Sequence, residues 1–192
     1  AEYGELLGLL HDLGKYSAVF QLYIQSAEGL LNPDDDEEFV DANGLKGKID
    51  HSTGGAQHIW AKLSTGNDAE KVLGQILSLC LVSHHSGLID CLKTDSNGTM
   101  DNFARRLGKD TEKTHIHEIL KHSEVTPRII ELLYNPSFSD PIQECIRDIV
   151  KMAPQKSGQS IVVQSQIGLL VRFLFSCLID ADRQDSADSE KP

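Results

Sequence analysis

Positive charge is scarce in this chain of 192 residues. It has 18 lysines and arginines against 29 aspartates and glutamates, which gives a formal net charge of −11. Such a chain is a poor match for broad electrostatic binding of nucleic acid, because that binding depends on many contacts between basic side chains and phosphates. If the substrate is a polyanion, bound cations or a partner must supply positive charge locally.

Paired cysteines and long apolar runs are also missing. The four cysteines, at positions 80, 91, 145 and 177, form no CxxC pair, so we expect reduced, mostly buried thiols in a cytoplasmic protein. No uninterrupted apolar run approaches the roughly 18 to 20 residues that cross a bilayer. The N-terminal run lacks the basic start of a signal peptide. We therefore expect no membrane partner.

The sequence contains no glycine-rich phosphate loop and no alternation of strands and helices. Apolar residues recur at helical spacing instead, which predicts an all-α protein with one core. We expect a domain at 1–185 and a disordered tail at 186–192. Shorter helices are expected between 93 and 122, and the main helices lie within 3–31, 50–63, 68–87, 126–135, 140–153 and 158–185.

Four places break the apolar pattern, each on or at the end of a segment otherwise built for burial. They are "HD" at 11–12, "DHS" at 50–52, "SHH" at 83–85 and "DAD" at 180–182. Burying such groups without partners is costly, so they must satisfy one another or hold a cation. Imidazole with carboxylate and no thiolate suits borderline transition metals. One carboxylate can bridge two ions, and two ions about 4 Å apart can promote in-line phosphoryl hydrolysis.

The order and spelling of "HDLGK", "DHSTGGAQ", "SHHSGLID" and "LIDADR" resemble the HD superfamily of metal-dependent phosphohydrolases. Within it, they are most similar to the HD nuclease domain of the CRISPR-associated helicase–nuclease of type I systems. The resemblance runs from Leu6 to Asp185. It implies an HD-domain helical bundle with a metal site in its core.

The resemblance also implies a role for each motif residue. Asp12 would bridge two ions, His11 and Asp182 would complete the first, and the second would be held by His51, His84 and His85. Asp180 is the second choice for the ligand role assigned to Asp182. Lys15 would face the scissile phosphate or stabilise charge developing on it, unless it only extends its ammonium group to water. Asp50 and Ser52 would cap the helix and support His51.

The ions implied are one or two divalent transition metals, with manganese, nickel, cobalt or iron favoured over magnesium. Members of the family usually carry a further metal-binding histidine in a helix upstream of the HD pair. Only ten residues precede His11 here, and none is histidine. We therefore expect that helix to be absent, which makes occupancy of the first ion an open question.

The function that the resemblance implies is hydrolysis of single-stranded DNA in type I CRISPR interference. The nuclease would work with a helicase domain or subunit and an RNA-guided surveillance complex. One alternative is an HD phosphohydrolase for nucleotides or cyclic nucleotides, although cyclic-dinucleotide members carry a Gly-Tyr-Pro that is absent from this chain. A second alternative is a non-catalytic helical interaction module. His58 is expected to be a core or surface residue, and the remaining histidines, at 115, 117 and 122, are expected in solvent.

Overall fold

Helices make up most of the structure, a computed structural model that describes residues 2–33, 36–45, 48–96, 98–122, 124, 126–153 and 159–189. The α-helices are α1 Glu2–Leu10, α2 Ala18–Ala27, α3 Ala42–Leu45, α4 Thr53–Leu63, α5 Asp68–Ser83, α6 Asn102–Leu107, α7 Thr111–Thr114, α8 Ile116–Ile119, α9 Thr126–Leu133, α10 Asp140–Met152 and α11 Gln159–Ser189. A short 3-10 helix, η1, covers Leu13–Tyr16. The prediction of a mainly helical protein is confirmed at this level.

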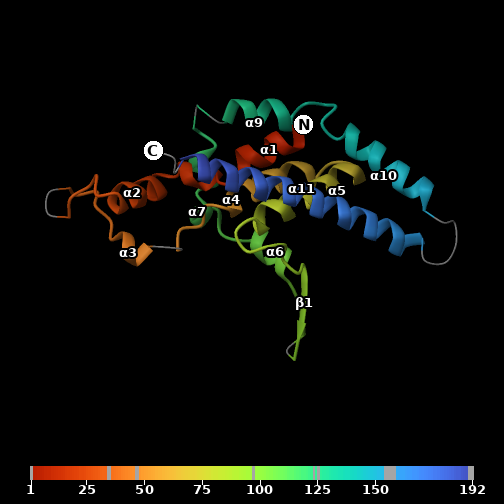
Figure 1. Ribbon diagram of the computed structural model, residues 1–192, viewed down its shortest axis with the longest axis horizontal. Coiled ribbons are helices and arrows are strands. Elements are labelled where there is room, and N and C mark those ends of the chain that lie inside the picture. The colour runs from red at the N-terminus through yellow and green to blue at the C-terminus, as the bar shows by residue number, and fades with distance from the viewer. Residues whose placement is uncertain are drawn as a thin grey trace.

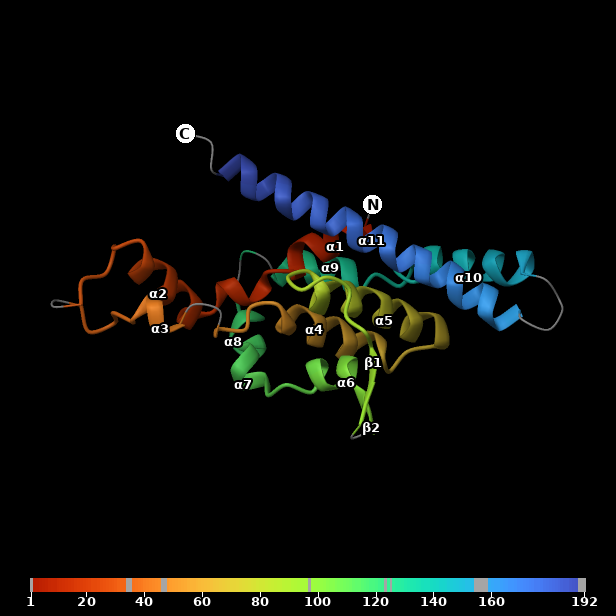
Figure 2. The same ribbon diagram turned by 60° about the horizontal axis from the view of Figure 1, so that its bottom comes forward.

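The core lies where α1, α4, α5 and α11 pack together. In Figure 2, α11 crosses over α1 on one side, while α4 and α5 lie beneath α1, and α2 and α3 extend to one end. Leu6 and Leu10 of α1 are completely buried and belong to one apolar cluster with Ile59 of α4 and Leu77 and Leu81 of α5. Burying a leucine or isoleucine contributes about 1.5–3 kcal/mol each. These contacts therefore fix the ends of α1 and α5 relative to each other.

Helix α5 begins with a complete capping box. The Asn67 side chain accepts hydrogen bonds from the backbone N–H groups of Ala69 and Glu70, and the Glu70 carboxylate accepts one from the Asn67 N–H. The cap satisfies donors that a helix start otherwise leaves unpaired. At its other end, α5 stops at Ser83, so that His84 and His85 follow directly after a buried helix.

The helix expected within 3–31 is broken in two. Helix α1 ends at Leu10, η1 follows a turn at His11 and Asp12, and α2 starts after Ser17, whose side chain accepts a hydrogen bond from the Phe20 N–H. The break allows a close approach at Gly14, where the N–H donates to the His51 carbonyl oxygen at 3.0 Å. A Cβ on Gly14 would overlap the His51 backbone. The turn therefore brings the "HDLGK" and "DHS" motifs into direct contact.

A β-hairpin occupies part of the region where we expected only short helices. Strands β1 Leu92–Asp95 and β2 Gly98–Asp101 pair antiparallel, with Leu92 opposite Asp101. Gly98 has φ 125°, a conformation that side-chain-bearing residues rarely adopt. The hairpin projects from the helical body in Figure 1. The prediction of short helices was wrong for residues 93–95 and 98–101, because strands as short as these are hard to recognise from the sequence pattern alone.

The four cysteines form no disulfide. Cys80 is buried in α5, Cys91 and Cys145 are partly buried, and Cys177 is exposed. The expectation of unpaired thiols is therefore met, whereas the expectation that most of them are buried was wrong. Burial raises the pKa of Cys80 to about 12, so this thiol is unreactive at neutral pH.

Helix α11 is the longest element and is exposed along much of its length. Leu169 and Phe173 are 58% and 64% exposed. The segment Ser160–Asp188 is long and apolar enough to cross a membrane by length and composition alone; an 18-residue window within it has a mean hydropathy of 1.7, and 11% of that window is buried. One such helix is weak evidence for a membrane span, and both the cytoplasmic location and the absence of a membrane partner stay predictions. The helix reaches Ser189, so residues 186–189 of the expected disordered tail are helical, and 190–192 lie outside the described residues.

A matched pair of glycine substitutions tests the close approach at Gly14. We expect Gly14→Ala to lower the free energy of unfolding by about 2–3 kcal/mol, as overpacked sites typically do. Gly4→Ala is the control, because a Cβ there meets nothing within 4 Å and alanine raises helix stability by about 0.4–1 kcal/mol. Urea unfolding followed by circular dichroism measures both, and equal stabilities for the two variants would contradict the packing.

Candidate metal centre

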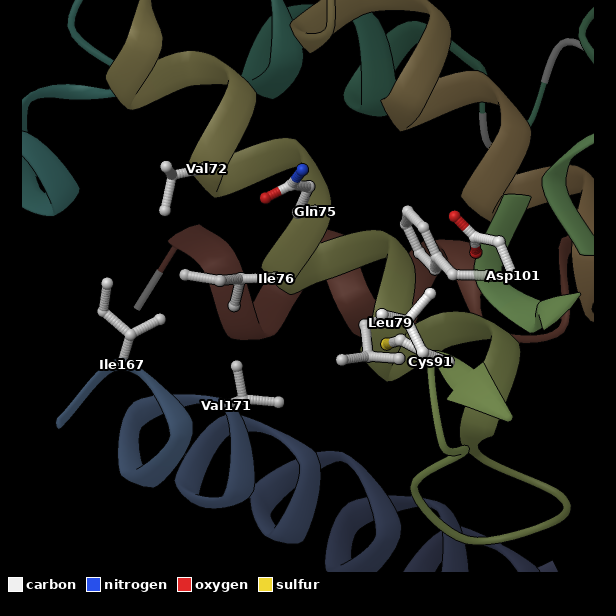
Figure 3. Close-up of a pocket in the computed structure, with 10 residues that line it drawn as sticks. Val72, Gln75, Ile76, Leu79, Cys91, Asp101, Ile167 and Val171 are labelled. Carbon is white, nitrogen blue, oxygen red and sulfur yellow. The ribbon is translucent and has the colours of Figure 1, made fainter. Parts of the chain in front are cut away.

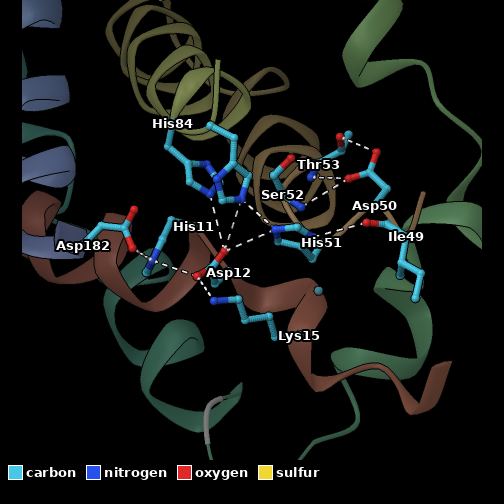
Figure 4. Close-up of polar contacts among 12 residues, drawn as sticks. His11, Asp12, Lys15, Ile49, Asp50, His51, Ser52, Thr53, His84 and Asp182 are labelled. Carbon is cyan, nitrogen blue, oxygen red and sulfur yellow. Dashed lines mark hydrogen bonds and ion pairs between the residues drawn. The ribbon is translucent and has the colours of Figure 1, made fainter. Parts of the chain in front are cut away.

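The Asp12 carboxylate lies at the meeting point of four chain segments (Figure 4). Its Oδ1 is 3.4 Å from His84 Nε2, 3.7 Å from His85 Nε2 and 3.9 Å from His51 Nε2. Its Oδ2 is 3.2 Å from His11 Nε2. The two oxygens therefore face different imidazole groups. This is the arrangement that a bridging carboxylate requires.

One group of potential ligands consists of His11, Asp12 and Asp182. His11 Nε2 lies 3.2 Å from Asp12 Oδ2 and 3.5 Å from Asp182 Oδ1. One ligand atom from each residue lies within 4.8 Å of those of the other two. Asp182 reaches the group because α11 crosses α1, as Figure 2 shows. This group therefore offers a metal ion one imidazole and two carboxylates.

A second group consists of Asp12, His51 and His85, again with ligand atoms within 4.8 Å of one another. The Nε2 atoms of His51 and His85 are only 2.6 Å apart. Two protonated nitrogens cannot approach so closely, so at least one of them presents a lone pair. His84, whose side chain is fully buried, directs its own Nε2 toward the same Asp12 oxygen.

Three of the imidazoles are held in the same way by the backbone. The Nδ1 atom is 2.8 Å from the Gly8 carbonyl oxygen in His11, 3.2 Å from that of Ile49 in His51, and 2.7 Å from that of Leu81 in His84. A carbonyl oxygen can only accept, so each Nδ1 carries the hydrogen and donates it. The lone pair of each neutral ring is then on Nε2, which faces the Asp12 carboxylate. Metal-binding histidines are typically oriented by such bonds.

Two buried atoms at the centre of the cluster lack a partner. Within the described part of the chain, Asp12 Oδ1 and His84 Nε2 each make no hydrogen bond. An unsatisfied buried polar atom costs about 1–3 kcal/mol. A cation between these atoms would satisfy both, so the residues present fit a divalent metal ion.

Charge at the cluster favours an ionised Asp12 and affects the imidazoles differently. Burial acts to lower the pKa of His11, but the hydrogen bond and the charge of Asp12 outweigh it and raise that pKa. Burial acts to raise the pKa of Asp12, but His11, His84 and Lys15 outweigh it and hold that pKa well below its ordinary range. Burial, followed by the nearby His84 and His51, lowers the pKa of His85 to about 4. Asp12 is therefore ionised and His85 is neutral at pH 7, which are the protonation states that bind metal.

Asp50 positions His51 through a network at the start of α4. One oxygen of Asp50 accepts hydrogen bonds from the N–H groups of Ser52 and Thr53, and the other accepts from the Thr53 hydroxyl and from Lys109. The expected helix cap is thus Asp50, whereas the Ser52 side chain makes no capping bond. Burial acts to raise the pKa of Asp50, but Lys109 and Thr53 outweigh it and lower that pKa.

Lys109 is the functional candidate that sequence reasoning missed. It lies in the region where only short helices were expected, and its ammonium group pairs with Asp50. The two residues are 59 positions apart in the chain. This pair could be predicted only weakly from the sequence. The aspartate of "DHS" is expected to need a cation as a partner, but the chain has several lysines that could serve.

Lys15 and the cluster share an open cavity of about 440 Å³. The Lys15 Nζ is 2.6 Å from Asp12 Oδ2, and its side chain is 45% exposed. Lys15 therefore contacts the central carboxylate while remaining reachable from solvent. The cavity is also lined by His11, Asp12 and Asp182, so a ligand in it can reach the first metal group.

Other candidate residues lie away from the cluster. Asp180 is exposed and accepts a hydrogen bond from Gln184 at 3.4 Å, so Asp182 is the aspartate that α11 directs to the site. His58 lines a separate cavity with His117. His117 is exposed as expected, but His115 and His122 are only partly exposed, so their expected exposure was wrong. His122 packs against the Tyr16 ring.

A further cavity, of about 370 Å³, lies between α5, α11 and the hairpin (Figure 3). Its lining is mainly apolar, including Ile76, Leu79, Ile167 and Val171. None of the site residues expected from the sequence lines it. The residues expected from the sequence to form the site therefore lie away from this apolar cavity.

Comparisons with protein-family models, with curated proteins and with solved structures find no match for this chain. The resemblance to HD phosphohydrolases therefore depends on the four motifs. The geometry adds that those motifs meet around one carboxylate.

Metal binding predicts a stabilisation that depends on His51. We expect Mn²⁺ or Ni²⁺ to raise the melting temperature of the unsubstituted protein, because a ligand of the folded state adds about 2.7 kcal/mol at 100 times its dissociation constant. His51→Ala should abolish the increase, and the exposed His117→Ala should retain it. Differential scanning fluorimetry gives the melting temperatures of the three proteins. The metal site would be refuted if neither metal changed the melting temperature of the unsubstituted protein.

The Lys109–Asp50 pair predicts an indirect effect on the metal. We expect Lys109→Ala to weaken metal affinity by about 10-fold or more, since residues that orient ligands typically contribute 10- to 100-fold. Lys113→Ala is the control, because it removes a nearby exposed lysine. Isothermal titration calorimetry with Ni²⁺ gives the dissociation constants, and equal values for the two variants would exclude the positioning role.

Proposed function

We propose that this chain is a metal-dependent phosphodiesterase of the HD nuclease type, acting on single-stranded DNA. The observation that carries the proposal is the set of Nε2 atoms directed at Asp12 by backbone-held His11, His51 and His84. A metal site explains the shared direction.

The ligands would divide between two ions around the shared carboxylate. His51, His84 and His85 would hold one ion with Asp12 Oδ1, and His11 and Asp182 would hold the other with Oδ2. Such ions activate water and polarise a phosphoryl oxygen when bound. The imidazole-rich set favours manganese, nickel, cobalt or iron over magnesium, which prefers oxygen ligands.

Lys15 contributes positive charge beside the central carboxylate of this acidic chain. Its ammonium group lines the cavity beside His11 and Asp182, and nearly half of its side chain is exposed. A phosphate entering that cavity would come within reach of it. Its role would be to stabilise negative charge that develops on the phosphoryl oxygens.

Recognition through ions and one lysine reads phosphate and not base edges, so sequence preference should be weak. As the motif resemblance implies, the substrate would be foreign DNA unwound by a helicase domain or subunit. That helicase would be recruited by an RNA-guided surveillance complex in the cytoplasm. The net charge of −11 agrees with a helicase partner. An acidic chain attracts DNA poorly by itself, so a partner that delivers the strand would help it to bind.

Cleavage assays with aspartate variants test the proposal. With Mn²⁺ or Ni²⁺, we expect Asp12→Ala and Asp182→Ala to slow hydrolysis of a single-stranded oligonucleotide by at least about 100-fold, since even supporting residues of metal sites contribute 10- to 100-fold. Asp180→Ala should retain activity, because Asp180 lies outside the cluster on the same helix. Nucleotides and cyclic nucleotides assayed in parallel identify the alternative substrate class. Undiminished cleavage by Asp12→Ala would eliminate the bridging mechanism.

A further inference from the structure

Tyr16 lines the same cavity as the metal cluster. It is the residue after Lys15 at the end of η1, and 37% of it is exposed. The cavity that it lines also contains His11, Asp12 and Asp182. An aromatic ring therefore lies beside groups suited to binding a phosphate. Aromatic rings in such places offer a flat surface to a nucleobase.

The Tyr16 ring packs against the His122 ring. The two ring centroids are 4.9 Å apart and the planes meet at 61°, an edge-to-face contact. Edge-to-face packing favours one orientation of the ring. With this contact in place, Tyr16 remains 37% exposed and lines the cavity.

The backbone around Tyr16 is fixed by a group of hydrogen bonds. The Lys15 N–H donates to the Asp12 carbonyl oxygen at 2.8 Å, and the Gln21 side chain donates to the Lys15 carbonyl oxygen at 2.8 Å. The Ser17 hydroxyl donates to the Gly14 carbonyl oxygen, also at 2.8 Å. Tyr16 is thereby tied to the segment that carries the central carboxylate. A preformed position lowers the ordering cost of binding.

We propose that Tyr16 is a stacking platform for the nucleobase next to the phosphate that is hydrolysed. This inference rests on the proposed function, and it specifies the substrate as a strand with unpaired bases. In a nucleic acid each phosphate has a base on the adjoining sugar, so a strand with a phosphate beside Lys15 brings a base near the next residue. A duplex keeps its bases stacked on one another and cannot offer one. Every base has a π face, so the platform tolerates any sequence.

The experiment combines tyrosine variants with oligonucleotides that lack bases. Phosphorothioate strands of equal length, one with bases and one abasic, carry a fluorescein label and resist hydrolysis. Fluorescence anisotropy in Mn²⁺ gives their dissociation constants. We expect the unsubstituted protein and Tyr16→Phe to bind the strand with bases about 10-fold more tightly than the abasic strand, a typical effect of base–aromatic stacking. In Tyr16→Ala the difference between the strands should disappear.

Tyr134→Ala is the control, because Tyr134 is 54% exposed and contacts Lys62 on another part of the surface. It should retain the difference between the strands. The proposal is overturned if Tyr16→Ala still distinguishes the strands, or if the unsubstituted protein binds both equally. Cleavage of ordinary DNA is measured separately. Stacking without cleavage would refute the nuclease alone, and cleavage without stacking would refute the platform alone.

Discussion

The contact on which the site depends is the convergence of imidazoles on the two oxygens of Asp12. A buried carboxylate keeps its charge only when its surroundings replace water. Here three Nε2 atoms approach Oδ1, and His11 and Lys15 approach Oδ2. Every main helix of the core contributes to that environment. Helix α1 leads to Asp12, α4 follows His51, α5 precedes His84, and α11 carries Asp182.

Two glycines allow those helices to meet so closely. Gly14 packs on the His51 backbone, and a Cβ on Gly55 of α4 would overlap the carbonyl oxygen of Leu10. Both glycines belong to the motifs "HDLGK" and "DHSTGGAQ". Their role is steric, since neither adopts a positive φ. The motifs therefore contain both the polar groups that face the cluster and the glycines whose lack of a side chain allows those groups to come together.

Local backbone bonds and distant packing contribute to the site in different ways. The bonds from His11 to Gly8 and from His84 to Leu81 join residues three positions apart, so each ring is oriented within its own turn. The Lys109–Asp50 pair and the approach of Asp182 join residues far apart in the sequence. Orientation of the rings is thus a local property. Their distance from one another is a property of the core.

The residues that break the hydrophobic pattern were identifiable from the sequence, because polar groups within apolar segments must find partners. The main helices were identifiable for the related reason that periodic burial has a recognisable spacing. The HD-type assignment and the metal remain proposals. Tertiary structure decided what spacing alone does not contain. It ended α1 at Leu10, where Gly55 of α4 packs closely, formed a hairpin at Leu92–Asp101, and placed Asp182, not Asp180, at the cluster. It also paired Lys109 with Asp50, since contacts between distant segments depend on how the core packs and not on local sequence.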